Sequence, residues 1–208
     1  MAAAEARDNA PPMTSERRIG AEDSATRLAL LDAAQQLMLE DGYAAVTSRR
    51  VAAKAGLKPQ LVHYYFRTMD DLFLAVFRRG AERNLERQAQ ALTSPQPLRA
   101  LWSFSNEPTG TALTLEFTAL ANHRKAIRSE IADYAERFRR QQTEALAAVL
   151  QSYGIDQTEF PPLAVLVLVN GLSRVMAMEA TLGLTSGHAE TIALVERYLD
   201  RYEPDRPD

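Results

Sequence analysis

The sequence predicts an all-α protein. Apolar residues recur at spacings of three and four, no segment alternates convincingly between apolar and polar residues, and Pro or Gly separates the helical stretches. The chain has 208 residues and an apolar fraction of 46%, which suffices for one large helical domain or two small ones.

The two ends of the chain lack this periodicity. Residues 1–22 are rich in Ala, Pro and charge, so we expect a disordered tail, and residues 204–208 form a shorter one. Arg17 and Arg18 could form a basic arm for a minor groove, although such tails more commonly serve only solubility.

The first helix is expected between an N-cap at Asp23 or Ser24 and a stop at Gly42. Its apolar stripe consists of Leu30, Leu31, Ala34, Leu37 and Met38.

Two short helices should follow. Thr47 can cap a helix over 48–55, and Pro59 stands at the favoured first position of a helix over 59–66. The linking sequence AGLK contains Gly56, which can adopt the left-handed conformation of a tight turn. Short helices joined in this way are typical of a helix-turn-helix.

Longer helices fill the rest of the chain. Asp70 and Asp71 are expected to open a helix that reaches Leu92, because acidic residues favour the positive N-terminal end. Further helices are expected over 98–105, 109–122, 124–152, 160–183 and 187–202.

Charge is unevenly distributed along this acidic chain, whose net charge is −3. The acid-free segment, residues 42–69, contains no Asp or Glu, although it carries Arg49, Arg50, Lys54, Lys58 and Arg67. A solvated helical hairpin would explain the basic residues but not the missing acids. A surface that faces phosphates excludes carboxylates, so the segment favours DNA binding.

Other function classes find little support. The chain has no cysteine, and His63, His123 and His188 show no metal-ligand spacing, so we expect no metal site and no cofactor. No catalytic motif such as GxSxG or a P-loop occurs, so we expect no enzyme. No secretory signal is visible and the apolar run 163–169 is too short to span a membrane, which predicts a cytoplasmic protein without a membrane partner.

Residues 26–72 resemble the N-terminal domain of TetR-family transcriptional regulators. That family's pattern is a first helix ending in G(Y/F), followed by TT...IA..AGVS.G.LY.YF..K..L, and this chain has DGYAAVTSRRVAAKAGLKPQLVHYYFRTMDDL. The matching residues are Gly42, Tyr43, Thr47, Val51, Ala52, Ala55, Gly56, Val62, Tyr65, Phe66 and Leu72.

The resemblance implies that the second short helix lies in the major groove of an operator in double-stranded DNA. Lys58 and Gln60 have the chemistry to read guanine and adenine edges. They replace the family's Ser and Gly, His63 replaces its first Tyr, and Met69 stands where the family often has a phosphate-binding Lys. The implied DNA-binding residues are Thr47, Ser48, Arg49, Lys58, Pro59, Gln60, Leu61, His63, Tyr64, Tyr65 and Arg67.

For the remainder, the resemblance implies a homodimer and a pocket for a small-molecule effector. Asn170 and Arg174 are one turn apart and could hold a carboxylate or hydroxyl of an apolar effector. Alternatively, they make an interface hydrogen bond or pair with Glu116 or Glu179. The candidate effector-binding residues are Trp102, Phe104, Phe117, His123, Asn170, Arg174, Met176 and Met178.

These expectations combine into an all-α protein with a helix-turn-helix DNA-binding domain of three helices over 23–69 and a helical effector-binding and dimerisation domain over 70–203. The predicted function is a transcriptional regulator, a repressor that a small apolar effector releases from a palindromic operator. The alternative is a helical small-molecule-binding or scaffold protein without DNA-binding activity.

Overall fold

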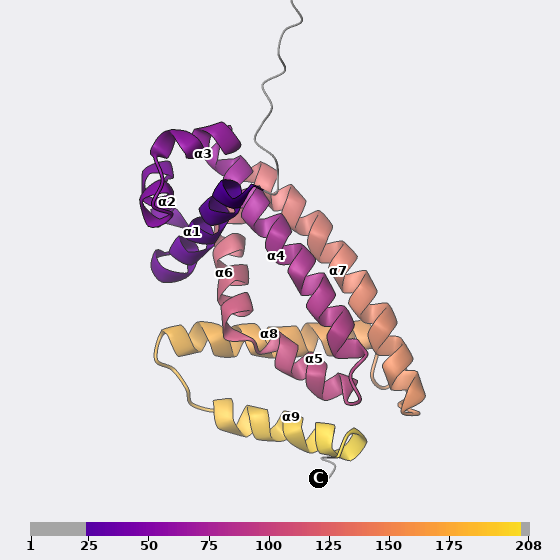
Figure 1. The fold of residues 1–208 in the computed structure, drawn as a ribbon. Helices are drawn as coiled ribbons and strands as arrows, with labels where there is room; N and C mark the ends of the chain where they lie inside the picture. Colours follow the sequence, from indigo (N-terminus) through magenta and orange to yellow (C-terminus); the bar gives the residue numbers. More distant parts are fainter. Residues whose placement is uncertain (1–23, 205–208) are drawn as a thin grey trace, which may run out of the picture.

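A computed structural model describes residues 24–204, and these contain helices and no strand. The expected tails, including Arg17 and Arg18, lie outside the described residues. The first unit, at one end of the molecule in Figure 1, consists of α1 (Ala25–Asp41), the 3-10 turn η1 (Tyr43–Ala45), α2 (Ser48–Lys54) and α3 (Pro59–Tyr65).

Local signals determine where these helices begin and end. The hydroxyl of Ser24 accepts a hydrogen bond from the backbone N–H of Arg27 at 3.2 Å, and Thr47 caps α2 through the N–H of Arg50 at 3.3 Å. Gly42 ends α1 with φ of 78°, a conformation that a residue with a Cβ resists.

The body follows without a break. Its helices are α4 (Met69–Leu92), α5 (Pro97–Ser105), α6 (Pro108–His123), α7 (Lys125–Ser152), α8 (Pro162–Thr181) and α9 (His188–Tyr202). The start of α4 differs slightly from expectation, because Thr68 is its N-cap and Asp71 forms the reciprocal half of a capping box.

The main hydrophobic core joins the two units. Leu30 and Leu31 of α1 and Val62 of α3 are buried in the same cluster as Leu72 and Val76 of α4. Its other buried members on the body are Phe73, Phe117, Leu120 and Ile127. The first unit is therefore packed on α4 and α6, chiefly through α1.

Helices α4 and α7 run side by side in the same direction (Figure 1). Arg78 pairs with Glu130 at 2.7 Å, and one turn later the hydroxyl of Tyr134 donates to the carbonyl of Ala81 at 2.9 Å. These contacts fix the register between the two longest helices.

Helices α8 and α9 lie at the end of the molecule remote from α2 and α3 (Figure 1). Within α8 only Leu166 and Ser173 are buried, although the helix is long and apolar enough to cross a membrane by length and composition. The sequence predicts this helix over 160–183, and its apolar character extends beyond the run 163–169, which alone is too short to span a membrane.

The C-terminal end of α9 is held by a buried carboxylate. Glu203 is 4% exposed and accepts hydrogen bonds from the backbone N–H groups of Leu98 and Arg99 and from the hydroxyl of Tyr153. It therefore caps the first turn of α5 from the far end of the chain.

Candidate DNA-binding face and effector cavities

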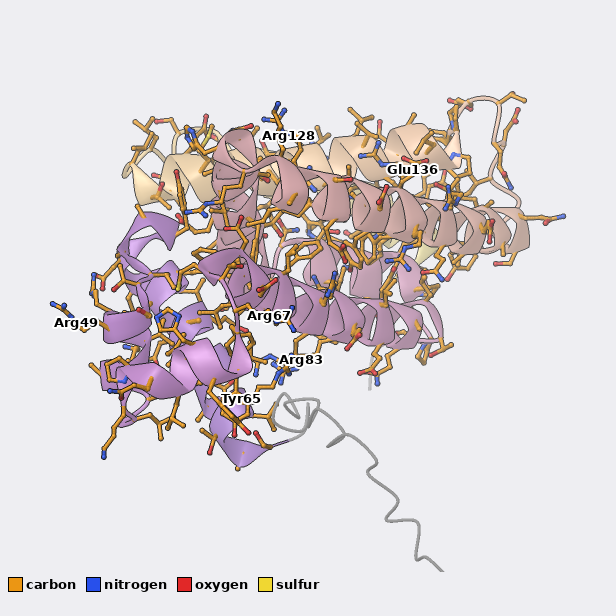
Figure 2. The ribbon with its side chains drawn as sticks, turned by 90° about the horizontal axis from the view of Figure 1, so that it is seen from above. Arg49, Tyr65, Arg67, Arg83, Arg128 and Glu136 are labelled. Atoms are coloured by element: carbon orange, nitrogen blue, oxygen red, sulfur yellow. The ribbon has the colours of Figure 1, made fainter. Side chains whose placement is uncertain are left out.

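The residues predicted to contact DNA lie on α2, α3 and the connections beside them. Arg49 extends away from the helices in Figure 2, and Tyr64 is 55% exposed. Thr47, Lys58, Pro59, Gln60, His63 and Arg67 are also exposed, whereas Ser48, Leu61 and Tyr65 are half-buried.

The orientation of α3 follows from its buried residues. Val62 and the following Phe66 pack into the core, so the opposite side of the helix faces solvent. Tyr65 is partly packed against that core and meets the ring of Tyr64 edge-on, with ring centroids 5.0 Å apart. The N-cap of α3 is Lys58, and no side chain makes a capping hydrogen bond there.

Two cations of the acid-free segment are already paired with α1. Arg50 contacts Asp41, and the ammonium of Lys54 lies 2.6 Å from a carboxylate oxygen of Glu40. The hydrogen bond from Lys54 holds the pKa of Glu40 below its ordinary value. Because α1 contributes these acids from just before Gly42, the basic surface is narrower than the sequence suggests.

A polar cavity of about 90 Å³ lies between α4, α5, α6, α7 and α8. Its lining includes Phe104 and Ser105 of α5, and Asn170 of α8 accepts a hydrogen bond from the hydroxyl of Ser105 at 3.5 Å. The remaining lining residues are Asn84, Arg87, Glu107, Gly110, Thr111, Thr114, Phe138, Ser173 and Arg174.

The carboxylate of this cavity is already engaged. Glu107 accepts hydrogen bonds from the N–H groups of Thr109 at 3.0 Å and Gly110 at 2.7 Å, and Arg87 lies 3.8 Å away. Partial burial acts to raise the pKa of Glu107, but these partners outweigh it and lower the pKa below its ordinary value. Arg87 also lies over the ring of Phe104, 5.6 Å from its centroid.

Arg174 is different, because no carboxylate among residues 24–204 pairs with it. The two acids considered as its partners have other contacts. Glu116 binds the backbone of Tyr43, and Glu179 lies 2.8 Å from His188.

A second cavity, of about 260 Å³, is apolar and is bounded by α5, α7, α8 and α9. Leu101, Trp102, Leu146 and Leu150 form its buried side. Val169 and Leu172 of α8 line this cavity, and the next residues along the helix, Asn170 and Ser173, line the polar one. The two cavities are therefore neighbours.

The effector-binding candidates separate into two groups. Phe104, Asn170 and Arg174 line the polar cavity and Trp102 lines the apolar one. The other four line neither cavity: Phe117 is in the core against Phe77, His123 is exposed and stacks on Tyr43 at 6.5 Å, and Met176 and Met178 lie elsewhere on α8. A contact of these four residues with an effector stays a prediction.

Two buried glutamines went unnoticed in the sequence. Gln88 on α4 is 3% exposed and Gln142 on α7 is 2% exposed, and the side-chain nitrogen of each is buried without a hydrogen-bond partner. Leaving a buried amide unpaired costs about 1–3 kcal/mol. Gln142 continues the inward stripe of Ile127, Ile131, Tyr134 and Phe138, a signal that the sequence does contain.

Helix α6 connects the polar cavity to the DNA-binding unit. Gly110, Thr111 and Thr114 line the cavity, and further along the helix Glu116 accepts a hydrogen bond from the backbone N–H of Tyr43 at 2.7 Å.

Among residues 24–204 no group of three His, Cys, Asp or Glu residues is placed to hold a metal ion.

Comparison with known proteins gives a match to a family model and a match to a known regulator. Residues 30–76 match the family model described as bacterial regulatory proteins, tetR family. The chain is 28% identical over 178 residues to the HTH-type transcriptional regulator BetI of Rhizobium meliloti (strain 1021), covering 78% of this chain and 86% of BetI.

Two solved structures share the fold. A transcriptional regulator from Saccharomonospora viridis in complex with choline superposes with a TM-score of 0.66 at 19% identity, covering 85% of this chain and 94% of that one. The regulator FadR from Bacillus subtilis in complex with stearoyl-CoA gives a TM-score of 0.61 at 14% identity, covering 86% and 99%.

Proposed function

We propose that the chain is a ligand-responsive, DNA-binding transcriptional regulator of the TetR family, and that it is a repressor which leaves a palindromic operator when its effector binds. The exposed face of α2 and α3 carries this proposal, because it presents cations and hydrogen-bonding side chains without a carboxylate of its own. Residues 24–69 would form the DNA-binding domain and residues 70–203 the effector-binding and dimerisation domain.

On DNA, α3 would enter the major groove with its N-terminal end foremost. Lys58 and Gln60 are exposed at that end, where they can reach base edges. Arg49, Arg67 and Tyr64 would contact phosphates on either side, and Thr47 and Ser48 would present the N-terminus of α2 to the backbone.

The dimer would form through α8 and α9. Val167 and Leu168 on α8 are 51% and 66% exposed, and Leu194 and Tyr198 on α9 are 47% and 53% exposed. An apolar surface on two adjacent helices is typical of a protein interface. A four-helix contact between two copies would bury this apolar surface and would place two α3 helices on one operator. We propose that the dimer acts in the cytoplasm.

The effector would bind in the helical body. The two similar structures hold ligands as different as choline and stearoyl-CoA. In this chain the apolar cavity supports a largely apolar effector, and Asn170 and Arg174 in the neighbouring polar cavity could bind its polar group.

The conformational change that releases the protein from DNA would be transmitted along α6. A ligand that moves the cavity-lining half of this helix would also move Glu116, which is bonded to the turn behind α1. The separation of the two α3 helices in a dimer would then no longer match the operator. We propose no enzymatic role, because no catalytic motif such as GxSxG or a P-loop occurs in the sequence.

Binding to the DNA upstream of the protein's own gene tests the proposal, measured by fluorescence anisotropy against a random duplex of equal length. Specific, salt-sensitive binding of a dimer would support it. Equal affinity for both duplexes would favour the alternative, a helical ligand-binding or scaffold protein.

A further inference from the structure

We infer that the effector is an amphiphile with an anionic carboxylate head, which Arg174 and the buried amides of Gln88 and Gln142 receive in and beside the polar cavity. This inference rests on the proposed ligand-responsive function and specifies the chemical class of the ligand.

The charge balance of the polar cavity favours an anion. Arg87 and Arg174 face one carboxylate, that of Glu107, which already accepts two backbone hydrogen bonds. Arg174 has no carboxylate partner among the described residues, so it can bind a ligand carboxylate.

A quaternary ammonium head fits poorly at the same place. Such cations bind the open faces of aromatic rings, with a nearby carboxylate to balance their charge. Here the guanidinium of Arg87 already lies over Phe104, and the carboxylate of Glu107 is satisfied by the chain itself.

The buried amides point to the same kind of ligand. Asn84 and Phe138 line the cavity, and Gln88 and Gln142 lie one turn further along the same faces of α4 and α7. The register set by the bond between Tyr134 and Ala81 brings Gln88 opposite Gln142 two turns later. Two buried amide nitrogens without acceptors would suit a carboxylate, which only accepts hydrogen bonds.

The apolar cavity would take the tail of such a molecule. On α7, Phe138 lines the polar cavity and Leu146 lines the apolar one, with Gln142 one turn from each. An effector whose head group is bound at Arg174 and the buried amides would therefore direct its alkyl chain toward Trp102 and Leu146.

Calorimetry with three probes of equal chain length tests the head group: decanoate, 1-decanol and decyltrimethylammonium. We expect decanoate to bind at least about tenfold more tightly than either of the others, as hydrogen bonds to a charged group imply. Butyrate tests the tail and should bind at least about tenfold more weakly than decanoate, because it has six fewer methylenes. Equal affinities, a preference for the cation, or no binding of any probe would overturn the inference.

Variants locate the head group. Arg174→Met should weaken decanoate about tenfold or more and leave decanol unaffected, whereas Arg139→Met, an exposed position on α7, should change neither. Gln88→Leu and Gln142→Leu should weaken decanoate while raising the unfolding temperature, because each removes an unpaired buried amide. Gln141 is the exposed neighbour of Gln142, so Gln141→Leu is the matched control.

A merely structural role of these glutamines predicts a lower unfolding temperature together with weaker binding, and that result would overturn their assignment. The proposed function fails separately, because operator binding is measured without any probe. A protein that binds its operator but prefers a cationic probe would refute the head group alone.

Discussion

The side chain of Glu116 and the backbone nitrogen of Tyr43 are 2.7 Å apart, a hydrogen bond between α6 and the turn that follows α1. Both partners are half-buried, so the bond is shielded in part from water. It ties the DNA-binding unit to the helix that lines the polar cavity.

Replacing Glu116 by Ala should lower the free energy of unfolding by about 1–2 kcal/mol, since the N–H of Tyr43 loses its acceptor. Glu116→Gln retains an acceptor oxygen and should lose less. Urea denaturation of the three proteins measures the differences, and Glu144→Ala on the exposed side of α7 serves as the control. A Glu116→Ala protein as stable as the parent would show that the bond contributes nothing.

Replacing Arg49 by Ala should weaken binding to all DNA sequences alike, because a phosphate contact carries no sequence information. The slope of log K against log salt should flatten by about one unit per lost contact, hence by about two for a dimer. Tyr64→Phe should weaken binding without changing the slope, since no charge is removed. Titrations over a salt series check both effects, and unchanged binding by the Arg49 variant would refute the proposed docking.

Lys58 and Gln60 should determine which bases are preferred. Alanine at either should cost about 1–3 kcal/mol on the best operator and leave non-specific binding nearly unchanged. Selection from random duplexes with the parent and with Gln60→Ala measures this directly. If the preference were the same at every position, base reading would pass to His63 or to DNA shape.

Introducing a charge on α8 should dissociate the dimer. Val167→Asp places a carboxylate in the exposed apolar face without altering the lining of either cavity. Sedimentation at micromolar concentration should show a dimer for the parent and for Ala148→Asp on α7, and a monomer or aggregate for Val167→Asp. A monomeric parent protein would contradict the proposed assembly.

Alkaline pH should weaken the attachment of α9. Burial, followed by the hydrogen bond to Glu203, raises the pKa of Tyr153 from 10.0 to about 12. The folded state favours the neutral phenol, so its contribution is complete below about pH 10 and is lost as pH rises toward about 12. The stability difference between the parent and Tyr153→Phe should therefore shrink over that interval, as thermal unfolding can show. The pKa of Tyr134 is also raised to about 12 by burial, but that effect is common to both proteins. A difference independent of pH would contradict this account.

The helices could be predicted because their signals are local. Ser24 and Thr47 cap helices, Gly42 ends one and Pro59 begins one, and each acts within four residues of its own position. The all-α class is confirmed for the same reason. The exposed positions of Lys58, Gln60 and His63 also followed from the pattern, since Val62 and Phe66 set the buried side of α3.

The cavities could not be predicted to the same extent, because they depend on which helices become neighbours. Phe117 and Met176 have the composition of a pocket, but packing places Phe117 against Phe77 and leaves Met176 away from both cavities. Gln88 becomes significant only when α4 and α7 lie parallel in their observed register. Gln142 was detectable, because a polar residue interrupts an otherwise apolar stripe.

The ion pairs of Arg50 with Asp41 and of Lys54 with Glu40 have a consequence for how the protein would find its operator among random sequences. Non-specific attraction grows with the number of cations free to displace counterions from DNA. Pairing two cations of each protomer within the protein reduces that attraction. The base-reading side chains of α3 remain able to contact the operator. The dimer would thus leave random DNA sooner after each encounter and sample more sites in a given time.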